Sequence, residues 1–305
     1  MNSYKRYLYL FLGTAAALMV LVGGLNLFVD PYDRFGLNRL GVYISAEREF
    51  KSTEFPRYAP EAVLLGNSRA AIINADGLKG HRFFNAAFGS AVLEEMCFFV
   101  DHYVKTQKLV VLSLDAFAFA SSSNVVKDPF TPLTLRRSLD YIFNLQNVEY
   151  SVRTIRDHLK GKHPSLAANG SFWEPNWAAE ADQADPETAN RRVQALVETL
   201  APYRFDPARL DQVREMRDLL ERRNIRLLVY LTPINRRVWL ELEGTPAQAE
   251  MNRTREALKA LFPGLVDLTE SEFSDPEYFF RGDPMHFRSA VGQQLLNERV
   301  LETGS

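Results

Sequence analysis

The longest run of apolar positions in this 305-residue chain extends from Tyr7 to Val29 and contains no charged side chain. At about 1.5 Å per helical residue, such a run covers the roughly 30 Å hydrocarbon core of a bilayer with a slight tilt. Lys5 and Arg6 precede it and Asp30 follows it, and basic flanks stay in the cytoplasm. We therefore expect a single-pass signal anchor in a bacterial inner or cytoplasmic membrane, with a cytoplasmic N-terminus and an extracytoplasmic (periplasmic) C-terminal domain.

Two other interpretations of this run compete with the signal anchor. A cleaved signal peptide has a shorter apolar stretch, of about 7–15 residues, followed by a small-x-small cleavage site. The sequence Gly23-Gly24-Leu25-Asn26 is followed by no convincing site of that kind, but cleavage stays open. A buried core helix is disfavoured because the run has no polar face.

Beyond residue 30, short apolar runs alternate with helical patterns. The expected strands are 62–65, a weaker one at 82–86, then 109–114, 225–231 and 265–268. The expected helices are 92–106, 207–223, 246–261 and 291–301. Near-continuous apolar strands separated by helices predict a mostly parallel sheet that is covered on both faces. The fold class is therefore α/β, a three-layer α/β/α domain preceded by one transmembrane helix.

The stretch from Ala116 to Tyr203 interrupts this alternation and is too long for an ordinary connection. We interpret it as an insertion with helices near 133–145, 148–159 and 190–200. The expected organisation is a cytoplasmic tip and anchor over 1–29 and one domain over 30–305, with the insertion at about 116–203.

Composition excludes several classes of protein. The chain has 36 basic and 38 acidic residues, a net charge of −2, with 46% hydrophobic and 24% charged residues. This profile is that of an ordinary folded protein, and it excludes a disordered chain, a collagen and a polybasic nucleic-acid binder. The single cysteine, Cys97, excludes an internal disulfide framework and a thiolate zinc cluster. No metal-ligand spacing and no phosphate- or dinucleotide-binding fingerprint occurs, so we expect no metal and no cofactor.

The residues that follow the strands carry the candidate chemistry, because ligands of open parallel sheets bind beyond the carboxyl ends of the strands. Ser68 follows the first strand, Gly89 follows the second, and Asp283 precedes His286 by three residues near the C-terminus. A serine hydroxyl becomes a nucleophile when a histidine, oriented by a carboxylate, takes its proton. We expect Asp283 to reach Nδ1 of His286 while Nε2 points to Ser68, and the backbone N–H groups of Ser68 and Gly89 to hold an oxyanion.

Each of these signals is weak alone. A serine after a strand is more often a helix N-cap than a nucleophile, and an Asp-x-x-His spacing is common by chance. The C-terminal helical pattern also fits a simple docking helix. The combination is more specific, because the serine comes early, the Asp–His pair comes last, and both follow suitable elements.

The combination of Gly66-Asn67-Ser68, Gly89 and Asp283-Pro284-Met285-His286 resembles the SGNH/GDSL superfamily of hydrolases and acyltransferases over roughly residues 62–300. The resemblance implies an SGNH-hydrolase-like, flavodoxin-like domain. It implies Ser68 as nucleophile, His286 as base and Asp283 as the acid that orients the base, with the N–H groups of Ser68 and Gly89 in the oxyanion hole.

Two positions depart from the family pattern. Asn67 stands where the family usually has Asp, and Asp115 stands where a third-block Asn would donate to the oxyanion hole. An ionised Asp115 only accepts hydrogen bonds, so it does not replace that donor. Three explanations stay open: a donor from the insertion, an acyl donor unlike the esters of the hydrolases, or low activity.

Four residues are candidate substrate contacts: Arg69, Asp115, Asn235 and Trp173. Arg69 follows the candidate nucleophile, and a surface salt bridge is the competing explanation for it. Asn235 follows a strong strand. Trp173, with Trp177 nearby, suits stacking on sugar rings, and packing of the insertion is an equally good explanation.

The anchor makes the chain similar to the alginate O-acetyltransferase proteins and the D-alanyl transfer protein of lipoteichoic acid modification. That resemblance implies a serine-dependent O-acyltransferase that O-acetylates an exported or cell-surface polysaccharide. It also implies a membrane-bound O-acyltransferase partner that supplies acyl groups, and no role for nucleic acid. Two alternatives stay open: an acetylesterase with the same triad, and a non-catalytic glycan-binding or scaffold protein of a polysaccharide-modification complex.

Overall fold

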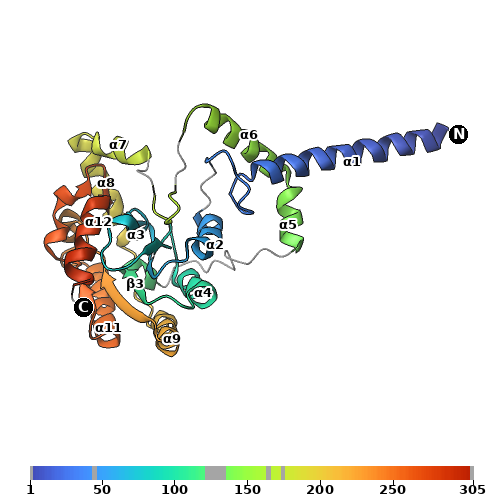
Figure 1. Cartoon of the computed structure of the whole chain (residues 1–305). Coiled ribbons are helices and arrows are strands. Elements are labelled where there is room, and N and C mark those ends of the chain that lie inside the picture. The colour runs from blue at the N-terminus through green and yellow to red at the C-terminus, as the bar shows by residue number, and fades with distance from the viewer. Residues whose placement is uncertain (1–2, 43–46, 121–134, 163–165, 173–175, 303–305) are drawn as a thin grey trace. The chain divides into compact units, whose positions relative to one another are not determined.

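A computed structural model describes residues 3–42, 47–120, 135–162, 166–172 and 176–302 of the chain (Figure 1). The chain forms two compact units, the first built from 1–53 and 131–165 and the second from 54–130 and 166–305. This division differs from the expected one at residue 30, because 30–53 and 131–165 cluster with the N-terminal helix and not with the sheet.

The first unit contains α1 (Ser3–Val29), a helix long and apolar enough to cross a membrane. Helices α5 (Leu135–Ile142) and α6 (Leu145–Leu159) pack against its C-terminal part. Asn26 of α1 is completely buried, and its Nδ2 donates to the carbonyl oxygens of Ile142 at 2.8 Å and Asn144 at 3.0 Å. These hydrogen bonds join segments more than a hundred residues apart.

The buried carboxylate of Asp30 holds the segment that follows α1. It accepts hydrogen bonds from the backbone N–H groups of Arg34 (2.8 Å), Phe35 (2.8 Å) and Leu37 (3.1 Å). The hydroxyl of Tyr141 in α5 donates to the same carboxylate at 2.9 Å. This shared acceptor explains why the segment after α1 belongs to the unit that contains α5.

The second unit is built on a five-stranded parallel sheet in the order β2-β1-β3-β4-β5, so the predicted α/β class and its parallel sheet are confirmed. The strands are β1 (Ala62–Leu65), β2 (Phe83–Asn85), β3 (Leu109–Leu114), β4 (Arg226–Leu231) and β5 (Val266–Asp267). Each falls within a predicted strand segment, and β1 and β3 have the predicted bounds. The central strands β1 and β3 are buried along their whole length, as their unbroken apolar sequences predict.

Helices cover both faces of the sheet. On one face, α4 (Leu93–Tyr103), α9 (Arg209–Arg222) and part of α11 (Pro246–Leu261) share a core with alternate residues of the strands. On the other face lie α3 (Ser68–Ala71) and α12 (Ser289–Leu295), and Figure 1 shows them away from α4 and α9. Leu64 and Val111 face α3 and α12, whereas Val63 and Val110 face α4 and α9.

Several further elements complete the chain. They are α2 (Glu47–Tyr58), α7 (Asn176–Asp182), α8 (Pro186–Leu200), α10 (Arg236–Glu241), η1 (Ala75–Gly77), η2 (Ala116–Phe119), η3 (Glu272–Ser274), η4 (Pro276–Tyr278), the hairpin β6 (Phe279–Phe280) and β7 (Asp283–Phe287), and η5 (Leu296–Val300). Helix α8, expected within the insertion, shares a third core with α10 and α11. Helices α2 and α10 and the β6–β7 hairpin were not expected.

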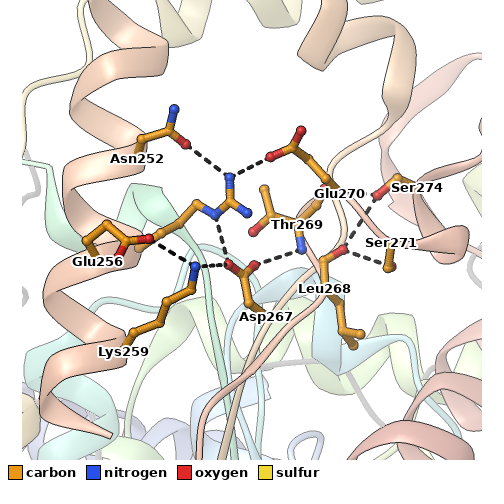
Figure 2. Close-up of polar contacts among 10 residues, drawn as sticks. Asn252, Glu256, Lys259, Asp267, Leu268, Thr269, Glu270, Ser271 and Ser274 are labelled. Atoms are coloured by element: carbon orange, nitrogen blue, oxygen red, sulfur yellow. Dashed lines mark hydrogen bonds and ion pairs between the residues drawn. The ribbon is translucent and has the colours of Figure 1, made fainter. Parts of the chain in front are cut away.

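The edge strand β5 is fixed by a charge network that joins it to α11 (Figure 2). Arg255 Nε donates to Asp267 at 2.9 Å, and Lys259 Nζ lies 3.2 Å from the same carboxylate. Arg255 Nη1 also donates to Glu270 at 2.6 Å. Burial disfavours ionisation of Asp267, but the hydrogen bonds from Thr269 and the Arg255 charge outweigh it and hold its pKa below the usual range.

We predict that Asp267→Asn destabilises the protein by about 1–2 kcal/mol at pH 7, since it leaves Arg255 and Lys259 without their shared carboxylate. A carboxylate whose pKa is lowered by folding contributes stability above its unfolded pKa and loses it as the pH falls through the folded pKa. The destabilisation should therefore shrink as the pH is lowered from about 5 towards 3.

Urea unfolding of the full chain in detergent, with both variants at several pH values, measures this difference. The control is Glu256→Gln, because Glu256 contacts the same Lys259 at 3.0 Å but is 72% exposed. It should change stability by less than about 0.5 kcal/mol. A pH-independent loss for Asp267→Asn would contradict the electrostatic explanation.

Candidate active site

Ser68 is the first residue of α3 and follows β1 after two residues, at the carboxyl edge of the sheet. Its approach to the sheet requires Gly66, because a Cβ there would lie 2.7 Å from Cβ of Ser113 and 2.9 Å from Cβ of Ala70. Asn67 caps α3, and its Oδ1 accepts a hydrogen bond from the backbone N–H of Arg69 at 3.1 Å. The cap residue is thus Asn67, and Ser68 keeps its hydroxyl for other contacts.

Asn85, at the end of β2, holds the other end of α3. It is completely buried, and its Nδ2 donates to the carbonyl oxygens of Ala70 (2.9 Å), Ala71 (3.2 Å) and Ile73 (2.8 Å). Its Oδ1 accepts from the backbone N–H of Ala87 at 3.0 Å. One side chain therefore satisfies the last carbonyls of the short helix that presents Ser68. Asn85 lies in the expected strand 82–86 and was not a candidate site residue; its signal is an amide at the end of an apolar strand.

Asp283 and His286 lie on β7. The pairing of β7 with β6 is irregular, and Asp283 Oδ1 accepts from the backbone N–H groups of Met285 (3.0 Å) and His286 (3.2 Å). The side chain of Asp283 thus closes a local turn of the backbone. This turn brings Asp283 and His286 to the same side of the strand, although they are three residues apart.

The three side chains expected to meet do so, although they come from opposite ends of the unit. Asp283 Oδ2 lies 2.7 Å from Nδ1 of His286, and Nε2 of His286 lies 2.8 Å from Oγ of Ser68. The side chain of His286 is 16% exposed and that of Asp283 is 24% exposed, so the chain of hydrogen bonds is sheltered yet reachable.

The charge of Asp283 fixes the tautomer of the histidine. Burial disfavours ionisation of Asp283, but the hydrogen bond and charge of His286 and the two backbone N–H donors outweigh it and hold its pKa below the usual range. An ionised carboxylate only accepts, so Nδ1 of His286 carries the proton. In a neutral imidazole, Nε2 is then an acceptor that faces the hydroxyl of Ser68.

Asp115, which follows β3, contacts the loop of the candidate nucleophile. Its carboxylate accepts a hydrogen bond from Nδ2 of Asn67 and another, at 3.2 Å, from the backbone N–H of Ala118. The two positions that depart from the family pattern are therefore partners of each other. With Oδ1 of Asn67 bound to Arg69, the amide is held by both of its ends.

The expected oxyanion donors are the backbone N–H groups of Ser68 and Gly89. In the described part of the chain, the N–H of Ser68 has no hydrogen-bond partner. Gly89 lies in the turn after β2, one residue beyond Phe88, whose N–H donates to the carbonyl oxygen of Gly66 at 3.2 Å. The loops that carry Ser68 and Gly89 thus run beside each other.

Arg69 is buried, with only 3% of its surface exposed, so the alternative explanation of a surface salt bridge is wrong. Its Nη1 donates to Oγ1 of Thr232 at 2.9 Å, and its guanidinium lies 5.7 Å from the ring centre of Phe117. Its Nε has no partner among the described residues. Burial lowers the pKa of Arg69, and the carboxylates of Asp115 and Asp283 oppose this, so a fixed positive charge lies beside the candidate site.

The structure describes one of the two other candidate contacts. Asn235 is buried, and its Oδ1 caps α10 through the backbone N–H of Arg237 at 3.0 Å. Trp173 lies outside the described residues, and Trp177 falls in α7.

A groove of about 570 Å³ lies between α7, α8 and the segment 282–285. Its lining includes Thr188, Arg192 and Thr199 on α8, together with Asp283 and Met285. Gly282 is required at this contact, because a Cβ there would lie 2.7 Å from Cβ of Ala184. The groove therefore reaches β7, the strand that carries Asp283 and His286. Within the described ranges, no group of three or more His, Cys, Asp and Glu residues is arranged to hold a metal ion.

Comparison with known proteins adds no family assignment, since no protein-family model matches the chain and no curated protein matches it significantly.

We predict that Asn85→Leu destabilises the protein by about 2–4 kcal/mol, because an apolar side chain of similar size leaves the buried carbonyls at the end of α3 without a donor. Amide hydrogen exchange in α3 should accelerate more than exchange in β3. The control is Asn297→Ala, since Asn297 donates to the carbonyl of Gly77 at 2.8 Å in an exposed position. It should cost less than about 1 kcal/mol. An equally small effect of Asn85→Leu would contradict the role given to Asn85.

Proposed function

We propose that this chain is a membrane-anchored acyl-transfer enzyme with Ser68 as nucleophile, His286 as general base and acid, and Asp283 as the acid that orients the base. The observation that carries the proposal is the unbroken hydrogen-bond sequence from Asp283 through His286 to Ser68. This order, a carboxylate acceptor, a protonated Nδ1 and an Nε2 that accepts from a hydroxyl, is the one that nucleophilic catalysis by a serine requires.

The chemistry follows from that order. As Oγ of Ser68 attacks the carbonyl carbon of an acyl donor, its proton moves to Nε2 of His286, and Asp283 stabilises the imidazolium. The bond to the leaving group then breaks, and the leaving group takes the proton from Nε2, which leaves an ester on Ser68. An acceptor hydroxyl gives its proton to Nε2 and attacks the ester carbonyl, and Oγ of Ser68 leaves and takes that proton from Nε2, so the enzyme is restored.

The oxyanion that forms in each step needs hydrogen-bond donors. The N–H of Ser68 supplies one, and we assign the second to the N–H of Gly89 on the neighbouring loop. The carboxylate of Asp115 is not a donor. Its part is to hold Asn67, the residue before the nucleophile.

The proposed substrate and setting follow from the resemblance and from α1. An SGNH-like domain behind a membrane helix supports O-acetylation of an exported polysaccharide, with a membrane-bound O-acyltransferase as the source of acyl groups. The groove along α8 supports this proposal because it offers hydroxyl and guanidinium groups next to β7, which carries Asp283 and His286. Lys5 and Arg6, which precede the apolar run of α1, support a cytoplasmic N-terminus and an extracytoplasmic catalytic domain.

We expect Ser68→Ala, His286→Ala and Asp283→Asn each to lower kcat/KM for an activated acetyl ester by about 10³-fold or more. Because the three groups act as one unit, the Ser68→Ala/His286→Ala double variant should lose no more than the worse single variant. Steady-state kinetics on the full chain, with circular dichroism to confirm folding, measure this. Unchanged polysaccharide acetylation in cells that carry Ser68→Ala would support the scaffold alternative instead.

The acceptor separates a transferase from an esterase, since both form the same acyl-enzyme. We expect oligosaccharide acceptors to divert acetyl groups from water, so that acetylated oligosaccharide appears while free acetate falls. Mass spectrometry of the oligosaccharide and an acetate assay measure the two products. Acetate release that no acceptor changes would favour the esterase alternative.

A further inference from the structure

The apolar helix α1 is buried only near its C-terminal end. Among its residues, Gly23, Asn26 and Val29 are the buried ones, in the last two turns. The uncharged part that precedes Gly23, residues 7–22, has a length of about 24 Å at 1.5 Å per residue. The long side chains of Lys5 and Arg6 extend the span towards the roughly 30 Å hydrocarbon thickness of a bilayer. The unit that surrounds the end of α1 therefore begins at the depth where a spanning helix would leave the hydrocarbon core.

Helix α5 meets α1 at this depth. A Cβ on Gly23 would lie 2.8 Å from Cε1 of Phe143 and 3.1 Å from Cγ2 of Ile142. In Figure 1, α5 runs across the direction of α1 and not along it. A helix placed in this way lies closer to the plane of a membrane than to its normal.

The exposed face of α5 is the apolar one. Leu135 is 79% exposed, Leu139 is 45% exposed and Phe143, just beyond the helix, is 47% exposed. These three residues recur every fourth position and so share one face. The buried residue is Tyr141, whose hydroxyl binds the carboxylate of Asp30. This arrangement reverses the usual amphipathic helix, in which the apolar face packs inward.

Helix α6 repeats the reversal. Leu145, Val152 and Leu159, seven positions apart, are 74%, 55% and 80% exposed. The buried positions of α6 are polar: Asn147, Ser151, Thr154 and Asp157. Ser151 Oγ donates to Oδ1 of Asn26 in α1 at 3.0 Å, so the polar side of α6 faces the end of the apolar helix.

Positive charge accompanies these exposed apolar residues. Residues 135–162 contain six basic and three acidic side chains, a net charge of +3, whereas the whole chain has a net charge of −2. The side chains of Arg136, Arg153 and Arg156 are 92%, 56% and 59% exposed. Arginines beside an apolar stripe are typical of helices that lie in the interface of an anionic membrane.

We propose that α5 and α6 form an interfacial collar around the exit of α1, with their exposed leucines inserted among lipid acyl chains and their arginines among anionic headgroups. This inference rests on the proposed membrane span of α1 and is independent of the triad. We assign the bilayer as the partner of this surface because the exposed apolar residues of α5 and α6 lie next to the end of the apolar helix α1, at the depth where headgroups begin. The arginines beside them complement the charge of anionic headgroups. The collar holds the first unit on the bilayer surface, whereas α1 alone would only tether it.

The test uses the full chain with Cys97→Ser and one new cysteine at a time, labelled with an environment-sensitive fluorophore and reconstituted into phosphatidylcholine–phosphatidylglycerol vesicles. The collar positions are Leu139→Cys and Leu145→Cys. The control on the same helix is Asp140→Cys, a polar position with a 71% exposed side chain. The control for the membrane span is Leu12→Cys, in the exposed middle of α1. Quenching by nitroxide lipids is compared with quenching by aqueous iodide.

We expect the labels at Leu12, Leu139 and Leu145 to be quenched by the nitroxide lipids, and the ratio of lipid to iodide quenching to be at least twofold higher at Leu139 than at Asp140. A lipid-quenched label at Leu12 with iodide-quenched labels at Leu139 and Leu145 would overturn the collar and leave the anchor in place. No lipid quenching at Leu12 would overturn the anchor and the collar together. Protection of Leu139 and Leu145 from both quenchers would show that protein, such as a second copy, covers this face, and would also overturn the proposal.

Discussion

The imidazole of His286 is the point on which the candidate site depends, because it joins a carboxylate fixed on β7 to a hydroxyl fixed on α3. The two distances, 2.7 Å to Asp283 and 2.8 Å to Ser68, are those of ordinary hydrogen bonds, so neither partner needs to move before a proton is transferred. The ionised state of Asp283 selects one tautomer of the ring. The proposed acyl transfer thus depends on a local electrostatic constraint together with the fold that brings residues 68 and 286 into contact.

The scaffold meets that constraint with polar side chains that do no chemistry themselves. Gly66 lets the turn after β1 approach β3, Asn85 closes the end of α3, and the Asn67–Asp115 pair joins the loop of the candidate nucleophile to the loop after β3. Buried amides and carboxylates are costly unless their hydrogen bonds are satisfied, so each such contact favours one arrangement over its competitors. The position of Ser68 is therefore specified by its neighbours on three adjacent strands.

Much of the fold was predictable because a central parallel strand is apolar along its whole length. The runs 62–65 and 109–114 have this pattern, and both became strands with the expected bounds. The meeting of Ser68 with His286 was predictable from the strand ends and from the order of the residues. The burial of Arg69 and the three-carbonyl contact of Asn85 were not, since a sequence pattern does not show which polar side chain will be enclosed when loops close over it. The β6–β7 hairpin was missed because its strands are short and irregularly paired.

In the first unit, too, a buried polar side chain has its hydrogen bonds satisfied, here near the end of an apolar helix. Asn26 would be costly in lipid, since its amide would lack partners there, but here the carbonyls of Ile142 and Asn144 and the hydroxyl of Ser151 satisfy it. A sequence window counts Asn26 as one polar residue in an apolar run and extends the expected span to Val29. The hydrogen bonds instead pack one face of the last two turns of α1, with Gly23, Asn26 and Val29, against protein, whereas Phe28 stays 81% exposed. The apolar run thus includes a segment, from Gly23 to Val29, of which one face is covered by protein and satisfies Asn26.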